Sequence, residues 1–73
     1  MDRAALEQLL QETEILLYRE DLTIARQREM IATLCQRGHD ASSARTALRR
    51  LESRQARHIA DRNRLFQQLA QQG

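Results

Sequence analysis

His58 is the side chain with the clearest potential for chemistry, because Asp61 and Asn63 follow it on a segment that the pattern predicts to be helical. An imidazole beside a carboxylate or an amide can take up and transfer a proton or a phosphoryl group. The run from His58 to Asn63 lacks, however, the His-Glu-Leu-Arg type of signature that usually marks phosphoacceptor helices. We therefore interpret His58 as a structural histidine, and we predict no catalytic residue, metal site or cofactor.

Cys35 is the lone cysteine, so no disulfide can form within the chain. One cysteine and two histidines also lack the spacing of a zinc site. His39 lies in a predicted turn, and the pattern brings together no Cys–His or Ser–His–Asp arrangement. Cys35 itself falls on an apolar stripe, which predicts that its thiol is buried as a small apolar group.

Arginines gather on one face of the predicted second helix, with Asp61 as the only acid among them. The set comprises Arg49, Arg50, Arg54, Arg57 and Arg64. Such a row could follow the phosphates of a nucleic acid. The preferred interpretation is a solvated outer face, because no aromatic ring is available there to stack on a base and no helix-turn-helix motif is present.

Two long helices must position these side chains. The chain has no proline, and Gly38 is its only internal glycine, so little in the sequence interrupts a helix on either side of it. Asp2 is a suitable N-cap residue, and Gly38 suits the end of the first helix. Asp40 can cap the second helix, with Ser42 or Ser43 as alternatives. We predict a single domain with a helix over about 3–37, a turn at 38–40 and a helix over about 41–71.

Each predicted helix carries a main apolar stripe with steps of three and four residues. In the first helix the stripe comprises Leu6, Leu9, Leu10, Thr13, Leu16, Leu17, Ile24, Ile31 and Cys35. In the second it comprises Ala41, Ala44, Leu48, Leu51, Gln55, Ile59, Arg62, Phe66 and Leu69, with His58 and Leu65 on its flank. A connection this short makes neighbouring helices antiparallel. The fold class is therefore all-α, an antiparallel two-helix hairpin.

The polar interruptions of the two stripes coincide near the middle of this hairpin. Folding the chain about position 39 places Glu20 opposite His58, within about a turn of Gln55 and Arg62. A carboxylate facing an imidazole and a guanidinium can fix the register of two helices by penalising misaligned pairings. We prefer this registry interpretation. The alternatives are solvation at the rim of the interface and a proton-transfer or ligand site.

The first helix has a second apolar stripe, formed by Ile15, Tyr18, Leu22 and Ala25 on a face roughly 150° from the main one at 100° per residue. The second helix of the same chain can cover only one side of the first. A second copy of the hairpin, giving a homodimeric four-helix bundle, is the simplest cover. An unlike protein partner is possible, and the bland alternative is that these are scattered surface residues.

Size and charge also favour association. The core of a chain of 73 residues rarely contributes more than about 3–5 kcal/mol to the free energy of folding by itself. Residues 1–36 carry four arginines against seven acids, and residues 37–73 carry eight arginines against three acids, so the two halves attract. No run of even eight apolar residues occurs, which predicts neither an export signal nor a membrane span, and we expect a cytoplasmic protein.

From Ile31 to Leu69 the chain resembles a pattern of short uncharacterised bacterial helical-hairpin proteins. The residues that carry the resemblance are Gly38-His39-Asp40, Leu48, Leu51-Glu52, His58 and Arg62-Asn63-Arg64-Leu65. It implies the hairpin fold and no established activity. In architecture alone the chain also resembles the Rop family of plasmid proteins, whose paired hairpins hold an RNA loop pair on one face. No motif of that family matches, so no binding residues carry over.

The function that these observations favour is a non-catalytic, oligomerising protein–protein interaction module. The alternative is a small Rop-like bundle that binds nucleic acid, RNA in particular, through the arginines of the second helix. No enzyme is expected.

Overall fold

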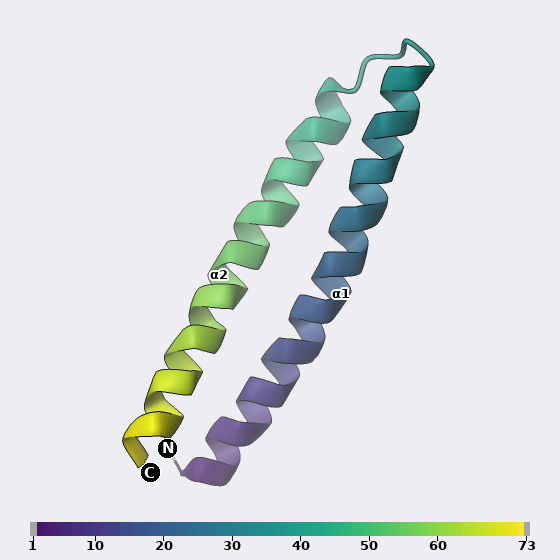
Figure 1. Cartoon of the computed structure of the whole chain (residues 1–73). Helices are drawn as coiled ribbons and strands as arrows, with labels where there is room; N and C mark the ends of the chain where they lie inside the picture. The colour runs from purple at the N-terminus through teal and green to yellow at the C-terminus, as the bar shows by residue number, and fades with distance from the viewer. Residues whose placement is uncertain (1, 73) are drawn as a thin grey trace.

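The computed structural model describes residues 2–72, which form two antiparallel helices lying side by side along their whole length (Figure 1). Helix α1 spans Arg3–Gln36 and helix α2 spans Ser42–Gln72. No strand occurs within this part of the chain. The rod they form measures 55 × 15 × 13 Å, with the start of α1 and the end of α2 together at the end opposite the turn. The all-α hairpin predicted from the sequence is confirmed.

The bounds of α1 follow from side-chain and backbone capping. The Asp2 carboxylate accepts a hydrogen bond from the backbone N–H of Ala5 at 2.7 Å. At the other end Gly38 has a φ of 72°, the left-handed conformation in which a side chain is strained. This conformation lets the N–H groups of Gly38 and His39 reach the carbonyls of Cys35 and Leu34, at 3.1 and 2.9 Å. The helix therefore ends in a Schellman motif.

Asp40 organises the start of α2. Its carboxylate accepts hydrogen bonds from the Ser42 hydroxyl at 2.6 Å and from the Ser42 backbone N–H at 2.9 Å. These two bonds, with a smaller contribution from the charge of Arg45, lower the pKa of Asp40. The ionised carboxylate thus satisfies a backbone N–H that the helix cannot satisfy itself.

The residues of each helix that face the other helix form what we call the seam. They follow one another at alternating steps of three and four residues. This is the heptad spacing of a coiled coil, and it keeps one line of residues facing the partner helix. The seam of α1 consists of Leu6, Leu10, Thr13, Leu17, Glu20, Ile24, Gln27, Ile31 and Leu34. Facing it are Ala41, which directly precedes α2, and the α2 residues Ala44, Leu48, Leu51, Gln55, His58, Arg62, Leu65 and Leu69.

Several residues of the predicted stripes lie outside this seam. Cys35 is exposed, so the prediction of a buried thiol is wrong. Leu9, Leu16 and Phe66 are also exposed, whereas His58 and Leu65, expected on the flank, are half-buried in the seam. The reason is the period with which the two helices face each other. Because the helices face each other with a repeat of 3.5 residues, apolar residues one position off the heptad fall beside the seam.

The core of the hairpin is thin. Only Leu6, Leu17, Ile24 and Ala41 are buried among the hydrophobic residues that the structure describes, and none of them belongs to α2. Two helices side by side can cover each other along one line only, so most of the remaining apolar surface stays open to solvent.

Neither described helix combines the length and the apolar character needed to cross a membrane.

Candidate functional site

Glu20 and His58 meet in the middle of the seam, one from each helix. Glu20 Oε2 lies 2.7 Å from His58 Nδ1, and the two side chains are 12% and 25% exposed. The sequence predicted this juxtaposition from the register of the hairpin. A carboxylate and an imidazole held at this distance, and largely removed from water, form a strong and directional hydrogen bond.

The other two members of the predicted polar cluster have different neighbours. Gln55 donates its side-chain N–H to Asp21 rather than to Glu20. Arg62 donates to the Asn63 side-chain oxygen at 3.5 Å, and its guanidinium carbon lies 6.0 Å from the centre of the Phe66 ring. The structure therefore joins Glu20 to His58 and does not join either of them to Gln55 or Arg62.

Two buried polar atoms of this layer have no hydrogen-bond partner among the described residues: Glu20 Oε1 and Arg62 Nε. Buried polar atoms normally find partners, and a bare one costs free energy. This layer of the seam therefore contains one strong hydrogen bond, between Glu20 and His58, and two buried polar atoms that lack a hydrogen bond. That combination suits a device that selects one alignment of the helices over its neighbours.

Further polar contacts cross the seam toward the turn. Gln27 donates to the backbone carbonyl of Ala44 at 2.9 Å, and Arg28 pairs with Glu52 at 3.1 Å. Arg45 donates to the Cys35 sulfur at 3.2 Å. Sequence reasoning missed Gln27 and Asp21. Gln27 follows Glu20 by seven residues, so the heptad spacing was the signal that could have identified it.

The second apolar stripe of α1 faces away from α2, and we call it the outer apolar face. Its members are Ile15, Tyr18, Leu22 and Ala25. The first three are 46%, 66% and 43% exposed. A tyrosine and two branched aliphatic residues three and four positions apart are neighbours on the helix surface. Exposed apolar residues that lie together in this way are typical of a protein contact.

A separate row of exposed apolar residues lies beside the seam on α1. Leu9, Leu16 and Met30 share one heptad position, about a quarter turn from the seam. Arg19 and Arg26 lie between this row and the outer apolar face. The two apolar surfaces of α1 are therefore distinct.

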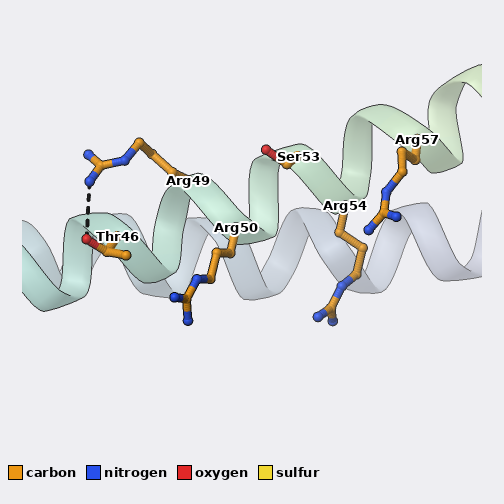
Figure 2. Close-up of a pocket in the computed structure, with 6 residues that line it drawn as sticks. All are labelled: Thr46, Arg49, Arg50, Ser53, Arg54 and Arg57. Atoms are coloured by element: carbon orange, nitrogen blue, oxygen red, sulfur yellow. Dashed lines mark hydrogen bonds between the residues drawn. The ribbon is translucent and has the colours of Figure 1, made fainter.

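The predicted arginine set divides into two parts. Arg49, Arg50, Arg54 and Arg57 line one open hollow on α2 together with Thr46 and Ser53 (Figure 2). Arg64 lines a different hollow near Leu9 and forms an ion pair with Asp61 at 3.7 Å. We call the first group of four the arginine cluster.

Within the arginine cluster the side chains differ in direction. Figure 2 shows Arg50, Arg54 and Arg57 projecting to the same side of α2, whereas Arg49 turns the other way and donates to the Thr46 hydroxyl at 3.1 Å. Arg50, Arg54 and Arg57 make no hydrogen bond or ion pair with other described residues. Three guanidiniums thus face solvent with all their donors available.

No group of three or more His, Cys, Asp or Glu side chains that could hold a metal ion is found in residues 2–72. Comparison with protein-family models, with curated proteins and with solved structures finds no match to this chain. The resemblance to bacterial helical-hairpin proteins therefore stays a prediction.

Proposed function

We propose that this protein is a non-catalytic interaction module that assembles with itself through the outer apolar face of α1. The observation that carries the proposal is the exposure of Ile15, Tyr18 and Leu22, which α2 leaves open on the side of α1 away from the seam. Full burial of one such side chain contributes about 1.5–3 kcal/mol. In a twofold-symmetric contact each of these residues is buried twice, once in each copy, so its contribution to the free energy of association is doubled.

Self-association would also add apolar burial to a hairpin whose own core is small. With four buried hydrophobic residues, the isolated hairpin has little apolar burial to offset the entropy of ordering its backbone. Small folds without a disulfide or a metal commonly gain the missing burial from a second chain. The outer apolar face supplies the surface for it.

The position of this face favours one form of the proposed assembly. Because the outer apolar face lies away from the seam, α1 would be held between α2 and the α1 helix of the second copy. The result is a four-helix assembly with the two α1 helices at its centre. A compact square bundle would instead use the row of Leu9, Leu16 and Met30 beside the seam.

Light scattering over a wide range of concentration tests the proposal. We expect a mass of twice the 8.5 kDa chain for the wild type, and a single-chain mass for Tyr18→Glu, which places a charge in the contact. Leu16→Glu is the matched variant, and we expect it to retain the dimer. A wild type that is monomeric throughout would contradict self-association. Dissociation by Leu16→Glu but not by Tyr18→Glu would move the contact to the row beside the seam.

A further inference from the structure

The arginine cluster of α2 is a concentration of charge that the fold does not need. Arg50 and Arg54 are four residues apart, and Arg54 and Arg57 are three apart, so they are neighbours on the helix surface. Like charges at these spacings destabilise a helix. Glu52, the nearest acid in sequence, pairs with Arg28 on the other side of the seam, and Asp61 pairs with Arg64. The repulsion within the cluster is thus left uncompensated by the chain.

The shape of the cluster indicates an extended anion rather than a small one. Arg50, Arg54 and Arg57 follow the helix axis and project to one side, as Figure 2 shows. They line an open hollow and not an enclosed pocket. The Ser53 hydroxyl also lines this hollow but points to the opposite side of α2 (Figure 2). At a rise of 1.5 Å per residue, the step from Arg50 to Arg57 is about 10 Å. A row of this length can contact several charges of one polymer.

Guanidinium groups suit phosphates because their planar fork can donate two parallel hydrogen bonds to one phosphate group. A double-stranded nucleic acid presents one phosphate charge per about 1.7 Å of its axis, so an axial row of arginines meets a matching row of anions. Single-stranded binding relies on aromatic stacking. Neither aromatic residue belongs to the cluster: Tyr18 lies on the outer apolar face of α1, and Phe66 lies beside Arg62.

We propose that the arginine cluster binds the phosphate backbone of double-stranded nucleic acid, without reading its sequence. Arg50, Arg54 and Arg57 contact the phosphates, and Arg49 becomes a fourth contact when it releases the Thr46 hydroxyl. The cluster is on α2 and the proposed dimer contact is on α1. Phosphate binding therefore stands or falls independently of self-association.

Fluorescence anisotropy with labelled random-sequence duplexes, one of DNA and one of RNA, tests this proposal in a series of salt concentrations. Affinity that falls steeply with salt is expected for at least one duplex, because each phosphate contact releases counterions. The double variant Arg50→Gln/Arg57→Gln should lower the slope of log K against log salt by about 1.8, since each contact contributes about 0.9. Arg54→Gln should lower it by about half as much.

The chain offers a matched control in Arg19 and Arg26. These arginines are also exposed and also seven residues apart, but they lie on α1 outside the cluster. Arg19→Gln/Arg26→Gln removes the same net charge and should leave the slope unchanged. Circular dichroism and light scattering of both variants show whether the fold and the assembly state are retained.

Four results would overturn the assignment. They are the absence of binding at low salt, an equal loss in the control variant, tighter binding of a single strand than of either duplex, and displacement of the duplex by polyglutamate as effectively as by unlabelled duplex. The last result would identify an acidic protein surface as the better partner. Binding of the DNA duplex, the RNA duplex or both supports the proposal, and their relative affinity tells which helical form fits.

Discussion

The two helices of this hairpin are nearly equal in length, at 34 and 31 residues, yet they use their side chains in opposite ways. In α1, Leu10, Leu17, Ile24 and Ile31 repeat every seven residues and fill the seam with branched aliphatic side chains. The seam residues of α2 are leucines mixed with Ala44 and with the polar residues Gln55, His58 and Arg62. No residue of α2 is buried.

Away from the seam the contrast continues. The outer side of α1 carries Ile15, Tyr18 and Leu22, whereas the outer side of α2 carries arginines. A helix that is apolar on two sides gains from a second protein contact, and a helix with unpaired cations gains from an anion. The comparison teaches that one short hairpin can expose two surfaces of different chemical character, because each helix needs only one line of residues for the fold.

Substituting isoleucine by alanine in each helix is the strongest test of this asymmetry. Ile24 of α1 is 3% exposed, and Ile59 of α2 is only half-buried. We expect Ile24→Ala to lower the free energy of unfolding by about 2–5 kcal/mol, because it leaves a cavity in the seam. Ile59→Ala should cost about 1–2 kcal/mol, in proportion to its smaller burial. Urea unfolding followed by circular dichroism measures both, and equal losses would contradict the asymmetry.

The hydrogen-bonded pair of Glu20 and His58 takes one polar side chain from each helix. His58→Leu leaves the Glu20 carboxylate largely buried without its partner, and we expect a loss of about 1–3 kcal/mol. The double variant Glu20→Leu/His58→Leu should recover most of that stability, because two leucines suit a seam position.

The registry hypothesis makes a further statement about that double variant. Stability regained without the polar pair should come with a loss of uniqueness, seen in light scattering as a mixture of assembly states. Glu20→Leu alone should likewise keep the fold and loosen the assembly. One sharp assembly state in both variants would show that the pair does not specify the register.

Asp40 lies two residues before α2, and its hydrogen bonds from Ser42 lower its pKa. A carboxyl group with a lower pKa in the folded state adds stability above its ordinary value of 3.8, and that stability is lost as the pH falls through the folded pKa. In Asp40→Asn the acceptor oxygen remains and the charge is gone. We expect the wild type to lose more stability than this variant on acidification below pH 4 or so. Identical pH profiles of thermal unfolding would contradict this expectation.

The smallest expected effect belongs to the exposed ion pair between the helices, Arg28 with Glu52. Their side chains are 63% and 45% exposed, so water screens the attraction. A double-mutant cycle with Arg28→Ala and Glu52→Ala should give a coupling of about 0.2–1 kcal/mol that decreases with salt. A coupling as large as that between Glu20 and His58 would show that exposure does not set the ranking of the contacts.

The sequence alone determined the local features of this protein. Gly38 and the two aspartates predicted where each helix begins and ends, because capping depends on groups within a few residues of one another. The short turn then made the helices antiparallel, and the antiparallel register placed Glu20 opposite His58. The outer apolar face and the arginines were also identified from spacing, and the structure shows that Arg64 lines a different hollow from the other four arginines.

Only the tertiary structure decided which side chains enter the seam and which partners they choose there. In the structure Leu65 lies in the seam and Phe66 lies outside it. Cys35 is exposed beside Arg45, and Gln55 donates its hydrogen bond to Asp21. The physical reason is that a free helix repeats every 3.6 residues whereas two packed helices face each other every 3.5. The difference accumulates along a long helix, so a residue's place depends on the partner helix as much as on its own neighbours.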